Sequence, residues 1–220
     1  MAALGADQFI EDLLVRGLAV RHVIVGDDFR FGKGRAGDFS MLQQMGQVHR
    51  FSVEAMPTVD IDGERVSSSA LRDALAVGNL EHAGRLLGRP YAIAGRVIHG
   101  DKIGRKIGFP TANIQLKRKK VPMTGVFAVT VAGLGGKPLP GAANLGVRPT
   151  LGDSAQPVLE VHLLDHDSDI YRAHLTVNFL HKLRDEAKYA SLDALTAQIA
   201  RDVEATRDYF KHYFKHTFKV

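Results

Sequence analysis

The sequence predicts two folds in one chain, an α/β layer followed by a small antiparallel β-barrel that ends in a helix. Near the N-terminus a helical pattern precedes a strand-like one, which is typical of an α/β layer. From Tyr91 on, strand-like runs recur between glycine and proline turns with no helical pattern between them, and this favours an antiparallel barrel over a parallel sheet. After Ser191, apolar residues recur at three- and four-residue spacing, which predicts a long terminal helix.

The composition is that of an ordinary globular protein with enough apolar residues for a sizeable core. The 220 residues are 45% hydrophobic and 24% charged, and they include no cysteine, so disulfides and thiolate zinc sites are excluded. The net charge of +5 suits anionic ligands but is spread along the chain, so a small phosphorylated partner fits as well as nucleic acid. No apolar run approaches the length of a membrane span. We therefore expect a soluble, cytoplasmic protein that acts on small molecules, without a nucleic-acid or membrane partner.

The N-terminal part alternates helices and strands. Its predicted elements are a helix over 7–16, a strand over 22–25, a helix over 38–45, strands over 48–55 and 58–61, and helices over 70–77 and 79–87. Gly88, Arg89 and Pro90 then break the pattern. We place a domain boundary there, which gives domains 1–88 and 89–220.

Two stretches of this part stand where a ligand could bind. Residues 26–34 follow the strand over 22–25 at its carboxyl end, where open α/β sheets place their ligands. Ser67, Ser68 and Ser69 precede the helix over 70–77, and their simplest role is to cap it.

A glycine-rich loop follows the first strand of the second domain. Residues 91–99 alternate with the period of a strand. Glycines at 100, 104 and 108 then stand among Lys102, Arg105 and Lys106, so backbone N–H groups and cations could surround a polyphosphate. These residues alone would favour a solvated surface loop.

The end of the loop changes that balance. Pro110 fixes the backbone just before Thr111 and Asn113, whose side-chain oxygens stand two residues apart. Such hard oxygen ligands suit a magnesium ion that is also coordinated by phosphate oxygens. The loop and its end together therefore indicate a phosphate site.

Four further strand-like runs follow, and a helix closes the chain. The predicted strands cover 125–132, 141–145, 158–164 and 174–180. Ser191 caps a helix that runs to about Phe214, and we expect this helix to lie across the barrel as a structural element.

Glu160 is the strongest catalytic candidate outside the loop. Leu159, Val161 and Leu163 share one face of the strand over 158–164, so Glu160 and His162 share the other. From this pattern alone a solvated face is favoured for the carboxylate, and a binding site is the alternative.

Ordered blocks of this domain resemble the riboflavin kinase family, and specifically the kinase half of prokaryotic bifunctional riboflavin kinase/FMN adenylyltransferases. The matching blocks are GRVIHGD from 95, GRKIGFPTAN from 104, ANLGVRPT from 143, LEVHLLD from 159 and LRDE from 183. They extend from about Tyr91 to the terminal helix in the family's order.

The resemblance implies a six-stranded Greek-key barrel and phosphoryl transfer from ATP to riboflavin, giving FMN. It implies that Thr111 and Asn113 hold Mg²⁺ and that Glu160 is the general base for the ribityl hydroxyl. Arg184 and Glu186 match a segment near the flavin, with a surface ion pair as the alternative reading. The implied ATP-binding residues are Gly95, Gly100, Gly104, Arg105, Gly108, Thr111 and Asn113, and a loop near the nucleotide carries Asn144, Arg148 and Thr150.

The N-terminal part resembles the adenylyltransferase half of the same family. The pattern Gly-x-Asp-Phe-x-Phe-Gly is present over 26–32, and a Ser-Ser-Ser motif with an arginine is present over 67–72. A His-x-Gly-His signature occurs nowhere in the chain. We therefore expect an incomplete Rossmann-like nucleotidyltransferase domain that does not make FAD here, although a longer parent protein would. Its vestigial nucleotide site would comprise Gly26, Asp28, Phe29, Ser67, Ser68, Ser69 and Arg72.

Two alternatives remain. The function could be the full bifunctional one of a parent protein. From another class, the second domain could be a small basic barrel that binds RNA or a protein without chemistry, with Lys117, Arg118, Lys119 and Lys120 as a basic run.

Overall fold

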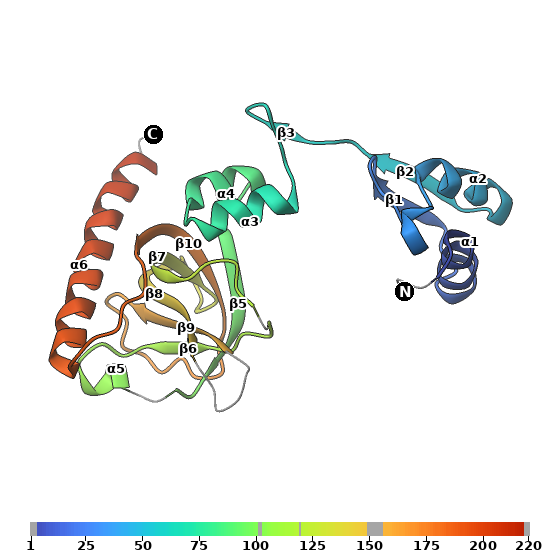
Figure 1. Cartoon of the computed structure of the whole chain (residues 1–220). Helices are drawn as coiled ribbons and strands as arrows, with labels where there is room; N and C mark the ends of the chain where they lie inside the picture. The colour runs from blue at the N-terminus through green and yellow to red at the C-terminus, as the bar shows by residue number, and fades with distance from the viewer. Residues whose placement is uncertain (1–3, 101–102, 119, 149–155, 218–220) are drawn as a thin grey trace. The chain divides into compact units, whose positions relative to one another are not determined.

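The computed structural model of the chain describes residues 4–100, 103–118, 120–148 and 156–217 (Figure 1). They form two compact units, Met1–Val66 and Ser67–Val220. Within the described residues, no helix combines the length and the apolar character that crossing a membrane requires.

The first unit is an α/β layer, as predicted. Asp38 caps α2, because its Oδ1 accepts a hydrogen bond from Met41 N at 2.9 Å. The helix continues to His49 and ends at Arg50 in a left-handed conformation, so the strand predicted from 48 begins only at Ser52. The elements are α1 (Ala6–Gln8), η1 (Phe9–Gly17), β1 (His22–Gly26), η2 (Lys33–Arg35), α2 (Phe39–His49), β2 (Ser52–Met56), β3 (Asp60–Ile61) and β4 (Glu64–Arg65).

Strands β1 and β2 are parallel, and β3 and β4 form a short hairpin. One face of the parallel pair packs on a small core with the helices. That core consists of Ala6, Ile10, Phe31, Leu42 and Phe51.

The second unit begins with two helices, α3 (Ser68–Ala76) and α4 (Leu80–Leu87). Both are capped by side chains: Ser67 Oγ accepts from Ala70 N and Asn79 Oδ1 from His82 N, each at 3.1 Å. The helices bury apolar side chains in the core of the following barrel. For this reason the compact units divide at Val66, before the break at 88–90, and the boundary between the family domains stays a prediction.

The barrel is closed by six strands in the order β10-β5-β6-β9-β8-β7, and every neighbouring pair is antiparallel. Successive hairpins join β7, β8 and β9, and β6 lies beside β9, which is a Greek-key arrangement. The predicted barrel is therefore confirmed. Its strands are β5 (Tyr91–Ile98), β6 (Ala112–Ile114), β7 (Gly125–Ala132), β8 (Leu139–Arg148), β9 (Gln156–Leu163) and β10 (His174–Arg184).

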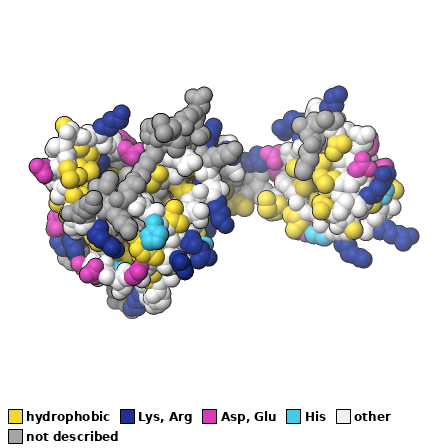
Figure 2. All heavy atoms as spheres, turned by 90° about the horizontal axis from the view of Figure 1, so that it is seen from below, with side chains coloured by type: hydrophobic (Ala, Val, Ile, Leu, Met, Phe, Trp, Pro, Cys, Tyr) yellow, Lys and Arg dark blue, Asp and Glu magenta, His cyan; other side chains and the backbone are white. Residues whose placement is uncertain are grey.

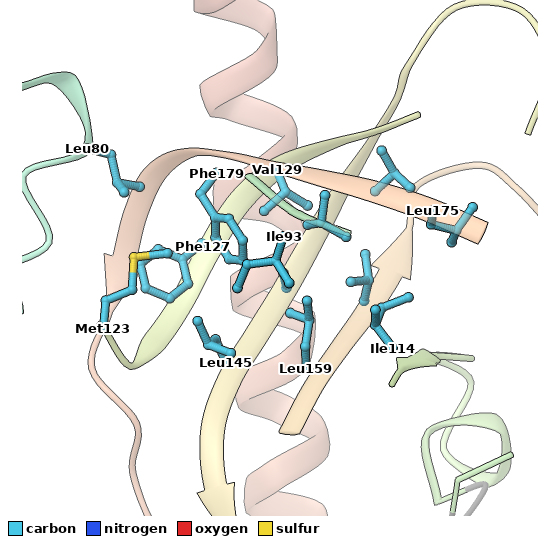
Figure 3. Close-up of a cluster of buried hydrophobic side chains, with 14 of the residues drawn as sticks. Leu80, Ile93, Ile114, Met123, Phe127, Val129, Leu145, Leu159, Leu175 and Phe179 are labelled. Atoms are coloured by element: carbon cyan, nitrogen blue, oxygen red, sulfur yellow. The ribbon is translucent and has the colours of Figure 1, made fainter. Parts of the chain in front are cut away.

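Alternate residues of these strands fill the barrel. Figure 3 shows Phe127, Phe179, Ile93, Leu145 and Leu159 pointing toward one another from different strands. The two phenylalanine rings meet edge to face with centroids 5.3 Å apart. The interior is thus a packed core, and ligands must bind on the outside.

The stretch predicted as a glycine-rich loop contains a short helix, α5 (Ile103–Lys106), and leads into β6. Phe109 N donates to Gly104 O at 2.8 Å, which folds the segment back on the helix. Strand β6 was not predicted, because a three-residue strand is too short for a periodic pattern.

The terminal helix α6 (Leu192–Thr217) is confirmed, with Ser191 Oγ accepting from Ala194 N at 3.1 Å. It packs along the outside of β7, β8 and β10 (Figure 1). Two ion pairs fasten it to the barrel: Arg184 with Asp202, and Arg207 with Asp165.

The pair between Asp165 and Arg207 gives a pH-dependent prediction. The Arg207 hydrogen bonds, at 2.6 and 2.9 Å, lower the pKa of the Asp165 carboxyl. A carboxyl with a lowered pKa stabilises the fold above its unfolded pKa of about 3.9, and this contribution is lost as the pH falls through the folded value. We expect Asp165→Asn to be less stable than the wild type near neutral pH, with the difference shrinking below about pH 4. Urea unfolding across this range checks it, and a difference independent of pH would contradict the assignment.

Candidate active site

A row of side chains crosses the outer face of the barrel. The strand register pairs Asn113 with Glu160, Glu160 with Asn144, Asn144 with Val126, and Val126 with Arg184. Side chains of directly opposite residues lie on the same face of a sheet. The row therefore gathers residues from β6, β9, β8, β7 and β10, which are distant in the sequence.

The Glu160 side chain points outwards, as its alternation with buried neighbours predicted. Leu159 and Val161 are at most 1% exposed and lie in the barrel core. Glu160 itself is half-buried. It is therefore partly shielded from solvent, and its role in a site stays a prediction.

This row forms the floor of a cavity of about 270 Å³. Helix α6 provides an apolar wall with Leu195, Ile199 and Val203, and the segment after β10 provides Tyr189. The sequence pattern predicted α6 only as a structural element. The helix pattern alone does not tell which of its faces meets the barrel, so these lining residues were missed.

The end of the glycine-rich segment also lines the cavity. Gly104, Thr111 and Asn113 line it together with Glu160. Thr111 additionally lines a neighbouring hollow, which contains Arg105 and the turn after β9. The structure thus brings the loop residues and the carboxylate to one place, with Thr111 between two hollows.

The other glycines of the predicted ATP site lie outside the lining of both hollows. A Cβ at Gly95 would meet Gln115 O at 2.5 Å, so the missing side chain permits close strand packing. A side chain at Gly100 would collide with the Asn113 side chain, and Gly108 has a left-handed φ of +83°. These three residues shape the segment.

Arg184 and Glu186 line the cavity, but they do not pair with each other. Arg184 Nε and Nη2 donate to the Asp202 carboxylate at 2.8 and 2.6 Å, and Nη1 donates to Asp185 O at 2.8 Å. The hydrogen bond to Asp202 raises the pKa of Arg184. The Glu186 carboxylate lies against Gly146, where any Cβ would collide with it.

Asn144 lies in strand β8, in agreement with the strand predicted over 141–145, whereas the family resemblance implied a loop near the nucleotide. His162, beside Phe109, contacts Pro110 O through Nδ1 at 2.8 Å, consistent with a structural role. Lys102, Lys119 and Thr150 lie outside the described residues, as does the side chain of Arg148.

The residues of the predicted adenylyltransferase site fall in both units. In the first, Asp28 forms an ion pair with Arg65 at 2.9 Å, and Phe29 stacks on Phe31 with centroids 5.6 Å apart. Gly26 ends β1. In the second unit Ser67 caps α3, and Ser68, Ser69 and Arg72 lie within that helix.

Comparisons with known proteins agree with this architecture. A family model for riboflavin kinase matches residues 87–210, and one for FAD synthetase matches residues 1–70. A crystal structure from Streptococcus pneumoniae, described as a macrolide-efflux protein, is 31% identical with a TM-score of 0.70, and the match covers 94% of this chain and 66% of that one.

Several relatives are bifunctional riboflavin kinase/FMN adenylyltransferases. That of Escherichia coli (strain K12) is 54% identical over 209 residues, and that of Pseudomonas fluorescens 52% over 207 residues; the matches cover 95% and 94% of this chain and 66% of each relative. That of Buchnera aphidicola subsp. Schizaphis graminum is 39% identical over 95% of this chain and 68% of its own length. The chain thus spans about two thirds of the length of these relatives. With its barrel, its covering helix and its match to the riboflavin kinase model, the chain belongs to the bifunctional riboflavin kinase/FMN adenylyltransferase family.

Proposed function

We propose that the chain is a cytoplasmic riboflavin kinase that transfers the γ-phosphate of ATP to the terminal ribityl hydroxyl of riboflavin. The observation that carries the proposal is the position of Glu160. It lies in the floor of the cavity, between the amides of Asn113 and Asn144 and beneath the apolar wall of α6.

Glu160 is the proposed general base. The hydroxyl oxygen attacks the γ-phosphorus, the bond to the β,γ-bridging oxygen breaks, and the Glu160 carboxylate takes the hydroxyl proton. FMN and ADP result. Because little covalent chemistry falls to the protein, holding the two substrates in line is its main contribution.

ATP is proposed to bind on the Thr111 side of Glu160. Arg105 and Thr111 line the neighbouring hollow, so a cation and a hydroxyl are available to phosphate oxygens there. Gly104 lies close to Phe109 O, where a side chain would collide, so the missing side chain lets the segment fold back tightly beside Thr111.

The oxygens of Thr111 and Asn113 fit a magnesium ion shared with the phosphates. Mg²⁺ is usually bound by few protein ligands, with substrate phosphates and water completing its shell. Within the described residues, no group of three or more His, Asp or Glu side chains could hold a metal alone. The two oxygens therefore fit an Mg²⁺ ion that binds together with ATP. There the ion would neutralise the charge on the phosphates.

The flavin ring is proposed to lie on the other side of Glu160. Val126 and the α6 residues Leu195, Ile199 and Val203 offer an apolar surface. Glu186 and Arg184 stand at the polar edge of the same cavity. The planar ring of riboflavin can then contact α6. Its connecting chain can follow the row of outer-face side chains until the reacting hydroxyl reaches Glu160.

Removing the Thr111 hydroxyl gives a test of the nucleotide side. Thr111→Val keeps the shape but loses one phosphate or metal contact, and we expect the KM for ATP to rise about 10-fold, in line with the loss of a charge-assisted hydrogen bond. The KM for riboflavin should change little. Steady-state kinetics with each substrate varied in turn measure both, and an equal rise in the two constants would contradict the placement.

The proposal as a whole is tested by incubating the chain with riboflavin, ATP and Mg²⁺ and separating the flavins by chromatography. We expect FMN without FAD, since the sequence has no His-x-Gly-His signature. FAD would instead support the full bifunctional activity. Absence of FMN would favour the binding-module alternative. Lys and Arg side chains stand at several places on the face seen in Figure 2.

A further inference from the structure

One amide in the outer-face row has no role in the proposed chemistry. Asn144 lies between Ala143 and Leu145, which are both fully buried, so its own side chain points out of the barrel into the cavity. It is half-buried there. Within the described residues its side chain has no hydrogen-bond partner. The amide is not among the buried unpartnered atoms of the described residues, so it is open to the cavity and available to a ligand.

A second asparagine on the outside of the barrel shows the contrast. Asn178 also lies between two buried residues and points outwards, and it donates to Thr130 Oγ1 at 3.4 Å. It is not part of the cavity lining. The two asparagines therefore have the same setting on a strand. They differ in that the Asn178 amide is hydrogen-bonded to another side chain, whereas the Asn144 amide faces the cavity.

The register places Asn144 on one definite side of Glu160. Asn113 is opposite Glu160 on β6, and Asn144 is opposite it on β8. The Asn113 side leads to Thr111 and the proposed phosphate site, whereas the Asn144 side leads to Val126 and α6. A ligand with its ring against α6 and its reacting hydroxyl at Glu160 must therefore pass its connecting chain along Asn144.

That connecting chain has the chemistry that an amide recognises. In riboflavin it is a ribityl chain with several secondary hydroxyl groups, each a donor and an acceptor. An asparagine amide offers two N–H donors and a carbonyl acceptor. Because the inference rests on the proposed kinase function, we propose, within that function, that Asn144 is a specificity-determining residue that binds the polyol chain of the flavin.

The test compares two flavins that share a ring. Riboflavin carries the ribityl chain, and lumiflavin carries a methyl group in its place. Binding of each is measured by the change in flavin fluorescence on titration with the wild type, Asn144→Leu and Asn144→Ala, with Asn178→Leu as the matched control. Circular dichroism shows whether each variant is folded, and the smaller Ala variant is the second measure if Leu does not fit.

We expect both Asn144 variants to raise the Kd for riboflavin by roughly 5- to 10-fold, the loss of about one hydrogen bond. The Kd for lumiflavin should stay within about 2-fold of the wild type. Asn178→Leu should leave both constants unchanged. This split is a result that a purely structural role of Asn144 would not produce.

Other outcomes separate this inference from the function on which it rests. A wild type that forms FMN, with Asn144 variants that weaken both flavins equally or neither of them, would overturn the role of Asn144 alone. A wild type that binds no flavin and forms no FMN would overturn the kinase proposal and this inference with it.

Discussion

Replacement of Glu160 by glutamine is expected to lower kcat for FMN formation by about 10²- to 10⁴-fold, the usual contribution of a positioned general base. Glutamine keeps the size of the side chain and its place between Asn113 and Asn144, but it cannot accept the hydroxyl proton. Because the cavity wall is unchanged, riboflavin should still bind with a Kd within about 3-fold of the wild type. Single-turnover assays and fluorescence titration measure the two quantities.

The control for this variant is Glu204→Gln, the same change at an exposed position of α6. It should leave kcat unchanged. A fall of less than a few fold in Glu160→Gln would mean that positioning alone carries the reaction and that Glu160 is not the base. A loss of riboflavin binding in parallel with kcat would instead assign the carboxylate to substrate binding.

Breaking the pair between Arg184 and Asp202 is expected to have the largest effect on stability. The Asp202 side chain is 9% exposed and that of Arg184 24%, and the two are joined by two hydrogen bonds. Removing one partner of a buried pair leaves the other charge desolvated, which costs about 3–5 kcal/mol. Since Arg184 keeps some contact with solvent, we expect Asp202→Asn to lose about 2–4 kcal/mol of unfolding free energy. Urea unfolding followed by circular dichroism measures it.

The same change should also impair activity, because the pair fastens α6 over the cavity. A matched variant separates charge from packing: Arg184→Met combined with Asp202→Leu removes both charges and is expected to recover most of the lost stability. Asp165→Asn, which breaks the more exposed pair on α6, should have a clearly smaller effect. Equal losses in the two single variants would show that the Arg184 pair behaves as a surface interaction.

Much of the fold could be predicted from local patterns. Strand periodicity located β5, β7, β9 and β10, and serine caps located the starts of α3 and α6, because these signals depend on residues close in the sequence. The short strand β6 was missed because its three residues are too few for a pattern. The end of α2 also went wrong by several residues, since a left-handed non-glycine residue such as Arg50 gives no strong sequence signal.

The sequence by itself determined which residue types were available: a carboxylate alternating with buried leucine and valine, and a hydroxyl and an amide after Pro110. Only the tertiary structure decided which of them meet. The register between β6, β9 and β8 sets Glu160 between Asn113 and Asn144, and it places Asn144, which lies in a predicted strand, on the cavity floor. The pairing of Arg184 with Asp202, and not with Glu186, depends on how α6 lies on the barrel. Pairing between strands and the packing of a helix depend on long-range contacts, and one sequence carries no local signal for them.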